Sequence, residues 1–281
     1  MAPIEDLRLQ PIDEGLIEGC MALSGAAGWN QLPDDWSFFI GHGKVFALLG
    51  DGGQPVATGA TLPYPGGFAW IGMVLVTASH RRQGLGTRIL QACMQEVRSK
   101  GLVPVLDATP AGETVYRPLG FEPHFGLSRW QGQGGNTGRM RPGIRPLRES
   151  DVAALVASDA MAFGAERPAL LTSLLRRAPQ LSLATDDGSG CVLARPGRLA
   201  TQLGPVIARS EMKAGELLEA ALDLVDGPVF IDVIDAHPEL ARVLKDRGFS
   251  IQRPFLRMAQ NRSTPFGDPR RLFSAVGPEF G

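Results

Sequence analysis

In the first half of the chain, continuous apolar runs typical of buried strands alternate with the one-sided apolar stripe of a helix. The run Trp70–Val76 is almost wholly apolar and rich in β-branched residues, which predicts a buried strand. A helical stripe follows, with polar residues on its other faces, and Gly101 supplies a plausible C-cap. Residues 103–109 then predict the next strand. The stripe consists of Ile89, Leu90, Cys93, Met94 and Val97.

The same order of patterns returns in the second half. The segment 144–151 restarts a strand and a helix capped at Ser150 or Asp151, much as residues 7–13 do near the start. Further pairs of similar segments keep the same order, and the last two keep constant spacing. These pairs are 70–76 with 204–208, 106–108 with 230–233, 119–121 with 247–249, and 128–130 with 256–258. The sequence therefore predicts an internal duplication, two α/β units of similar topology.

Composition shifts suggest where these units end. Residues 131–143 are glycine-rich and lack hydrophobic periodicity, which is typical of a linker. We predict a first repeat at 1–132, a linker at 133–143, a second repeat at 144–262, and a C-terminal segment at 263–281. That segment is too apolar for a free tail, so we expect it to dock back onto one of the repeats. Its apolar residues include Leu272, Phe273, Val276 and Phe280.

The loop between the first buried strand and its helix carries the chemistry. Gly84 and Gly86 remove side chains where backbone N–H groups point outward at a helix N-terminus, and this geometry binds anions. Arg81 and Arg82 add positive charge beside it. The loop lacks both the dinucleotide fingerprint GxGxxG and the lysine of a P-loop. We interpret it as a diphosphate cradle, although glycines also occur in such turns for packing alone.

The loop matches R-x-x-G-x-G and resembles the acetyl-coenzyme A loop of the GNAT acyltransferase superfamily. The resemblance implies that acetyl-CoA is the co-substrate and that backbone amides from Arg82 to Thr87 hold its diphosphate. It also implies that two strands splay beside this loop and leave backbone groups unpaired for the pantetheine arm. The coenzyme-binding residues implied are Val74, Val76, Arg81, Arg82, Gln83, Gly84, Leu85, Gly86 and Thr87.

The segment 115–121 resembles the Y-x-x-x-G-F segment of the same superfamily. The tyrosine at this position often protonates the departing thiolate, and here it is Tyr116. The alternative is that its hydroxyl caps a loop while its ring fills the core. The whole chain resembles a subgroup with two GNAT domains. The implied fold is a tandem of similar α/β domains with mixed sheets, the second of them diverged.

The second repeat departs from the motif in two places. Residues 211–216 hold one glycine and acidic residues at the helix start, which suit a helix dipole but repel a diphosphate. Leu244 stands where the first repeat has Tyr116. We therefore expect a single working site, in the first repeat, and a degenerate copy beside it.

An amine acceptor must lose a proton, because a lysine-like amine has a pKa of about 10.4. Asp107 is the best candidate for the base, since it interrupts an apolar strand and a buried carboxylate usually has a purpose or a partner. The alternative is a structural hydrogen bond to a neighbouring loop, which Asp232 at the matching place of the second repeat favours. Glu113 is the second candidate. His80, beside the loop, is expected to face solvent.

The acceptor region is expected between the first two helices. Trp29, Asn30, Asp35 and Trp36 could form an aromatic and acidic pocket for a small cation. The alternative is that the two tryptophans pack the first helix onto the sheet.

Composition narrows the remaining classes. The 281 residues carry a net charge of −1, which gives no hint of nucleic acid. Three distant cysteines fit a reducing cytoplasm, and the four histidines show no metal-ligand spacing. No apolar run approaches membrane-spanning length, so we expect no membrane partner. The sequence predicts a metal-free N-acyltransferase for a small-molecule amine. The competing class is a non-catalytic acyl-CoA sensor, and formation of a homodimer stays open.

Overall fold

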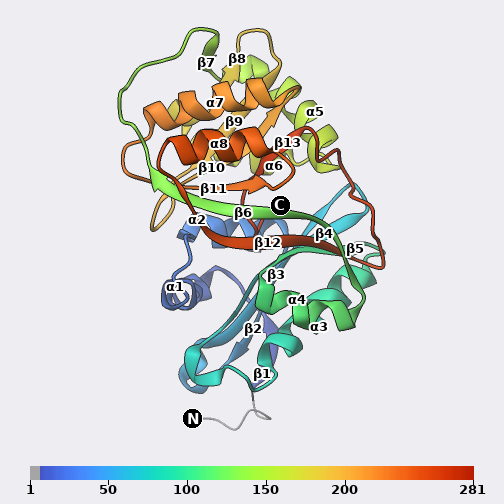
Figure 1. Ribbon diagram of the computed structural model, residues 1–281. Coiled ribbons are helices and arrows are strands. Elements are labelled where there is room, and N and C mark those ends of the chain that lie inside the picture. The colour runs from blue at the N-terminus through green and yellow to red at the C-terminus, as the bar shows by residue number, and fades with distance from the viewer. Residues whose placement is uncertain (1–6) are drawn as a thin grey trace. The chain divides into compact units, whose positions relative to one another are not determined.

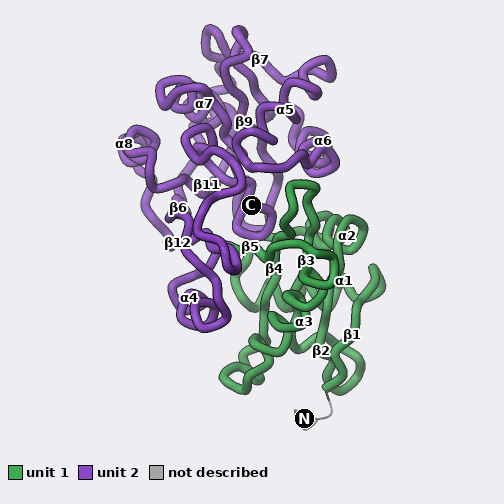
Figure 2. Tube along the Cα trace, turned by 90° about the vertical axis from the view of Figure 1, so that its right-hand side faces the viewer, with its two compact units in different colours: residues 1–106 green, residues 107–281 purple. Residues whose placement is uncertain are grey.

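The computed structural model describes residues 7–281, which form two compact units, residues 1–106 and 107–281 (Figure 2). The border between the units falls inside a strand, 26 residues before the end of the first repeat at residue 132. "Repeat" below refers to the duplication along the sequence, and "unit" to these compact bodies.

The sheet of unit 1 is mixed. Four strands pair antiparallel in chain order, and the fifth pairs parallel with the fourth. Three helices complete the unit (Figure 1). The strands are β1 (Arg8–Pro11), β2 (Lys44–Leu49), β3 (Pro55–Tyr64), β4 (Phe68–Val76) and β5 (Val103–Ala108), and the helices are α1 (Ile17–Ala26), α2 (Pro33–His42) and α3 (Leu85–Ser99).

The predicted strand–loop–helix of the first repeat is confirmed. Trp70 and most of β4 are buried, and α3 buries the whole predicted apolar stripe together with Leu85. Glycine is required at one place in this packing. A Cβ on Gly59 of β3 would stand 2.4 Å from Ile89 Cγ2, so the glycine lets α3 approach the sheet closely.

Unit 2 holds a larger mixed sheet, with α7 and α8 side by side against it (Figure 1). Its strand order is β12-β6-β11-β13-β10-β9-β8-β7. The strands are β6 (Phe121–Gln133), β7 (Ile144–Pro146), β8 (Leu183–Thr185), β9 (Gly190–Arg195), β10 (Thr201–Ala208), β11 (Pro228–Ile234), β12 (Ser250–Gln260) and β13 (Leu272–Ala275). The helices are α4 (Pro110–Tyr116), α5 (Val152–Phe163), α6 (Pro168–Arg177), α7 (Glu211–Leu224) and α8 (Pro238–Asp246).

Strand exchange explains why the units differ from the repeats. The strand β6 ends the first repeat, yet it lies between β11 and β12 of the second repeat and pairs antiparallel with both. Its pairing with β11 runs from Pro228↔Gln133 to Ile234↔Leu127. The glycine-rich stretch after β6 is tied to the end of α7, since Gly135 N donates to Leu222 O at 2.7 Å. For this reason the two compact units do not divide at this linker.

The C-terminal segment supplies a strand of unit 2. β13 is inserted between β10 and β11 and pairs antiparallel with each. Phe273 and Phe280 are buried, and Arg167 Nη1 donates to Gly281 O at 2.7 Å. A Cβ on Gly204 would meet Ala275 O at 2.0 Å, so glycine is needed where β10 passes β13.

Across residues 7–281, every helix is too short or too polar to span a lipid bilayer.

Candidate active site

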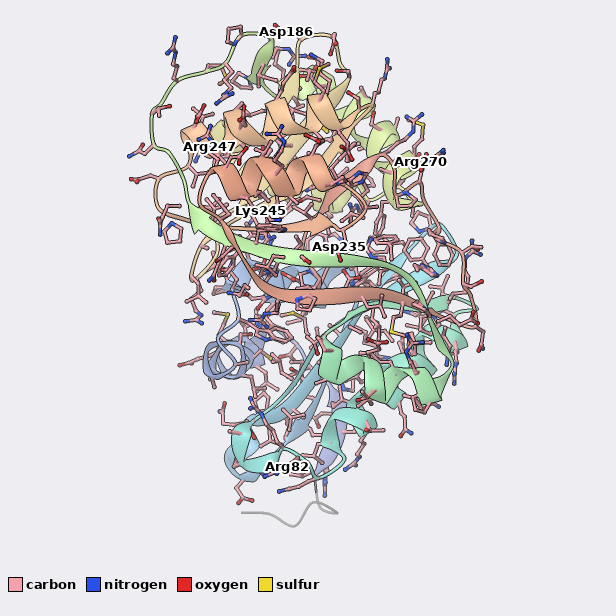
Figure 3. All side chains as sticks on the ribbon, viewed as in Figure 1. Arg82, Asp186, Asp235, Lys245, Arg247 and Arg270 are labelled. Carbon is pink, nitrogen blue, oxygen red and sulfur yellow. The ribbon has the colours of Figure 1, made fainter. Side chains whose placement is uncertain are left out.

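The loop from β4 to α3 bends through two left-handed residues. Gly84 has φ +80° and is the N-cap of α3, and Arg82 has φ +60°. Arg81 and Arg82 are exposed, and Arg81 Nε donates to Val76 O at 3.3 Å (Figure 3 labels Arg82 on this loop). Glycine at position 84 follows from its φ value, because other residues adopt that conformation at a cost.

The N-terminus of α3 is uncapped among residues 7–281. No side chain in that range caps it, and its first turn holds no acidic residue. A Cβ on Gly86 would meet only Val76 Cγ2, at 3.6 Å, which is an ordinary contact. Packing within the protein therefore does not demand glycine at 86. The missing side chain leaves the first turn of the helix open at this position.

Of the other loop residues predicted to bind the coenzyme, some can offer only backbone groups and others can offer a side chain. Leu85 is buried in the core, so only its amide faces the loop, whereas the Thr87 side chain is exposed. Gln83 Nε2 donates to Ser79 O at 3.3 Å, while its buried Oε1 has no hydrogen-bond partner in the part of the chain that the structure describes. The expectation that His80 faces solvent is wrong. It is 8% exposed, and its Nδ1 lies 3.0 Å from Thr77 Oγ1 and 2.9 Å from Ser79 Oγ.

The strands β4 and β5 part beside this loop. Their parallel pairing runs only from Phe68↔Val103 to Trp70↔Val105. Thr77 N donates to Val56 O of β3. In an antiparallel pair, successive residues alternately face the partner strand and face away from it. The backbone N–H and C=O of Val76, one residue earlier, therefore point away from β3. Val74, two residues earlier, has the same orientation. A bulge at Met73 (φ +56°), held by Thr58 Oγ1 donating to Met73 O at 3.0 Å, precedes them.

Tyr116 ends α4 in unit 2 and is half-buried. Its ring packs beside that of Phe121, with centroids 5.9 Å apart. Gly112 makes room for the ring, because a Cβ there would stand 2.9 Å from Tyr116 Cε2. Thr109 caps the same helix by accepting from Gly112 N at 3.2 Å. The helix thus places the tyrosine ring across its own first turn.

Asp107 forms a buried ion pair. Arg257 on β12 donates Nε and Nη2 to its two carboxylate oxygens, both at 2.9 Å. Burial raises the pKa of Asp107 above its ordinary value, and the charge of Arg257 opposes that rise. Because both oxygens are engaged and the side chain is inaccessible, the structure favours a structural pair over a base. The partner is a strand residue, Arg257, and not the neighbouring loop that the structural alternative named.

A matching ion pair involves Asp232, the corresponding aspartate of the second repeat. Arg129 on β6 donates to both oxygens of Asp232 on β11, each at 2.8 Å, and Gln202 Nε2 donates to Asp232 Oδ2 at 2.9 Å. The two pairs are crossed, since each aspartate takes its arginine from the other repeat. Sequence reasoning missed both arginines. The signal was present, because an arginine recurs at the same place in segments 128–130 and 256–258.

Glu113, the second candidate for the base, lies on α4. Its carboxylate is paired with Arg117 at 2.6 Å and is 31% exposed. It is therefore accessible to solvent, unlike Asp107.

The acceptor candidates differ in accessibility. Asp35 and Trp36 are both 0% exposed. Asp35 Oδ2 accepts from Leu32 N at 2.8 Å at the start of α2, and Trp36 Nε1 donates to Ser24 Oγ at 3.1 Å. These contacts favour the packing alternative for both. Trp29 is half-buried and Asn30 is buried in the loop between α1 and α2.

The second repeat is closed where the first is open. Ser210 Oγ caps α7 by accepting from Lys213 N at 3.4 Å, and Glu211 stands in the first turn. His237 Nδ1 lies 3.3 Å from Glu211 Oε1, and its Nε2 lies 3.1 Å from Leu272 O. Leu244, at the place of Tyr116, is fully buried. The start of α7 is thus occupied by the protein's own groups.

Comparison with known proteins agrees with this duplication. Residues 20–121 match the Acetyltransferase (GNAT) family, and residues 155–274 match an Acetyltransferase (GNAT) domain. The chain is 26% identical over 246 residues to the uncharacterized N-acetyltransferase YitH of Bacillus subtilis, covering 85% of this chain and 86% of that one. It is 23% identical over 265 residues to a holothin acyltransferase of Pseudoalteromonas, covering 89% and 88%.

The fold has a close counterpart among solved structures. A putative acetyltransferase from Pyrococcus horikoshii superposes with a TM-score of 0.80 at 18% identity, covering 100% of this chain and 98% of that one. Together with the two matches to GNAT sequences, this similarity confirms the tandem fold expected from the sequence. The chain is an acyltransferase that belongs to the GNAT acetyltransferases and carries two GNAT domains in tandem.

Proposed function

We propose that this protein transfers an acyl group from acetyl-CoA to a primary amine of a small molecule, using one working site in the first repeat. The observation that carries the proposal is the N-terminus of α3, which is uncapped, free of acidic residues and framed by Gly84 and Gly86. Unpaired amides at a helix N-terminus and two exposed arginines favour a diphosphate.

The loop residues hold the co-substrate, which brings the thioester acyl group. Amides from Gly84 to Thr87 bind the diphosphate, the Thr87 hydroxyl adds a donor, and Arg82 adds charge. The outward backbone groups of Val74 and the amide of Val76 bind the pantetheine arm and the carbonyl oxygen, while Val76 O accepts from Arg81 Nε. These contacts fix the acyl carbon for attack, and such positioning is a major part of acyl-transfer catalysis.

The chemistry is a direct displacement. The neutral amine attacks the thioester carbonyl, the new C–N bond forms, the C–S bond breaks, and the proton of the amine leaves to a base. Tyr116 donates its phenolic proton to the departing thiolate, as its motif position suggests. Of the two carboxylates predicted as the base, the accessibility of Glu113 favours it over the paired Asp107.

The acceptor is proposed to lie against the loop between α1 and α2, with Trp29 and Asn30 as its contacts. The Pseudoalteromonas relative is a holothin acyltransferase, and its similarity over most of both chains supports a small-molecule acceptor here. Three unpaired cysteines support a cytoplasmic setting for the reaction.

Thiol release from acetyl-CoA, measured against a panel of small primary amines, tests the proposal. Burial raises the pKa of Cys20 and of Cys191 to about 12, so these thiols stay protonated and do not disturb a thiol reagent near neutral pH. We expect amine-dependent release and an acylated product by mass spectrometry. Binding of acetyl-CoA without turnover on any amine would instead favour the acyl-CoA sensor.

A further inference from the structure

A cavity in the second repeat is lined by none of the residues assigned above to coenzyme binding, catalysis or the acceptor. It has a volume of about 110 Å³ and is bounded by α5, by the turn between β8 and β9, and by the end of β10. For comparison, a dry engineered cavity of about 150 Å³ binds benzene. The space therefore suits a short hydrocarbon chain or a small ring.

The interior of the cavity is apolar. Leu155, Cys191, Ile207 and Ala208 line it and are themselves buried. Burial raises the pKa of the Cys191 thiol to about 12, so this side chain stays neutral and presents a small apolar surface. An apolar wall of this kind stabilises hydrocarbon, and it offers little to a wholly polar ligand.

The rim of the cavity carries excess positive charge. Arg145 is neutralised, since it donates to both oxygens of Asp151, at 2.6 and 3.0 Å. Arg209 is exposed and forms no ion pair with any residue that the structure describes. Arg271 has only a 3.7 Å contact with Asp268, whose carboxylate Arg270 already binds at 2.9 Å (Figure 3 labels Arg270).

The backbone brings Arg209 and Arg271 to the same part of the rim. Ala208 N donates to Arg271 O at 3.2 Å, which fixes the residue before Arg209 against Arg271 itself. Guanidinium groups match the geometry of a carboxylate, and charge-assisted hydrogen bonds are among the strong ones in proteins.

The first repeat shows what a closed version of this place looks like. Gly19, the third residue of α1, is packed against the first residue of β3, because a Cβ there would stand 2.6 Å from Pro55 Cδ. The third residue of α5 is Ala154 and the first residue of β9 is Gly190, and both line the cavity. The helix and the sheet have separated in the second repeat at the place where they touch in the first.

We propose that this cavity binds a small organic carboxylate with a short apolar chain. The carboxylate lies between Arg209 and Arg271, and the chain lies over Leu155 and Ile207. The second repeat would thus hold a ligand site of its own, distinct from acetyl-CoA chemistry and independent of the function proposed for the first repeat.

Titration of the full chain with hexanoate, followed by protein-observed NMR, tests the proposal. Acetate supplies the head group alone, and hexanol supplies the chain alone. We expect saturable binding of hexanoate at one site, with both other probes much weaker. Replacing both arginines (Arg209→Gln with Arg271→Gln) should weaken hexanoate at least about tenfold, the loss of one charge-assisted contact. Arg176→Gln, at an exposed arginine outside the cavity, is the matched control.

A second variant tests the cavity itself. Ala154→Trp places an indole into the space from an exposed helix position and should abolish binding, whereas Ala153→Trp, one residue earlier and outside the lining, should not. Equal binding of hexanol and hexanoate would overturn the role of the arginines. Equal binding of acetate and hexanoate would overturn the role of the cavity. Absence of saturable hexanoate binding would overturn the proposal whatever the variants do.

Discussion

Both repeats contain a pair of parallel strands that part after a short ladder, but a further strand fills the gap in only one of them. In each, two parallel strands pair over three residues and then part, Phe68–Trp70 with Val103–Val105 in the first and Thr201–Leu203 with Val229–Ile231 in the second. Beyond that point β13 pairs with both strands of the second repeat. In the first repeat, no strand among residues 7–281 takes the corresponding place between β4 and β5.

The helix after each opening repeats the contrast. α3 has a glycine N-cap and an open N-terminus, while α7 has a serine cap, an acidic first turn and a histidine contact. Under the function proposed here, a coenzyme site on this fold requires unsatisfied backbone groups as well as the fold itself. In the second repeat, the groups that would bind a pantetheine arm or a diphosphate are satisfied within the chain.

The largest effect should come from closing the open helix. Gly86→Trp fills the space in front of the α3 amides and should abolish acetyl-CoA binding, because the amides can no longer reach a phosphate. Met212→Trp is the matched control, since Met212 is also the second residue of its helix and is 67% exposed. Calorimetric titration measures both. Tight binding to Gly86→Trp, or its loss in Met212→Trp, would break the comparison.

The crossed ion pairs should matter equally to stability. Removing one partner of a buried pair typically costs about 3–5 kcal/mol, so Asp107→Asn and Asp232→Asn should lower the free energy of unfolding by similar amounts. Urea unfolding measures this, with turnover at temperatures where both variants are folded as the second readout. A loss of turnover confined to Asp107→Asn, with a changed pH profile, would restore Asp107 as the base.

Loss of the proposed acid should slow the reaction without weakening the coenzyme. Tyr116→Phe should lower kcat at least about tenfold, the lower end for a positioned acid, while acetyl-CoA affinity stays unchanged. Tyr64→Phe, at the other tyrosine, is the control. Gly112→Ala should also lower kcat, because its Cβ displaces the Tyr116 ring. An unchanged kcat in Tyr116→Phe would remove this residue from the mechanism.

The smallest effect concerns the carboxylates at the two helix starts that begin the repeats, Asp151 and Asp13. Hydrogen bonds from Arg145 lower the pKa of Asp151 to about 2. A lowered native pKa stabilises the fold above the ordinary value near 4, and the contribution disappears as pH falls towards 2. Asp151→Asn should therefore cost about 1 kcal/mol or less near pH 7 and almost nothing near pH 2.5.

Its control is Asp13→Asn in the first repeat. Asp13 caps the corresponding turn by accepting from Gly15 N at 2.9 Å, and no arginine among the described residues pairs with it. Urea unfolding of both variants across this pH range measures the difference. A cost for Asp151→Asn that stays constant down to low pH would show that Arg145 does not set it.

Local pattern was enough to predict much of this molecule. The apolar stripe of α3, the strand β4, the glycine loop and the duplication all follow from periodicity and turn chemistry, which act over a few neighbouring residues. Long-range pairing was not accessible in the same way. The recurrence of arginine in segments 128–130 and 256–258 marks Arg257, but nothing near it indicates that its partner is Asp107, 150 residues away. Nothing near Leu272 indicates that its strand enters between β10 and β11. The burial of Asp35 and Trp36 was likewise not visible in the sequence, because it depends on the packing of α1 against α2. For that reason the two residues resembled part of a pocket.

Isothermal titration of the full chain with acetyl-CoA tests the central claim most directly, because it reads affinity and stoichiometry together. The open first repeat and the strand-filled second repeat predict one site per chain. Two sites would show that β13 and the capped α7 do not close the second repeat. Absence of binding would show that the open N-terminus of α3 is not a coenzyme site.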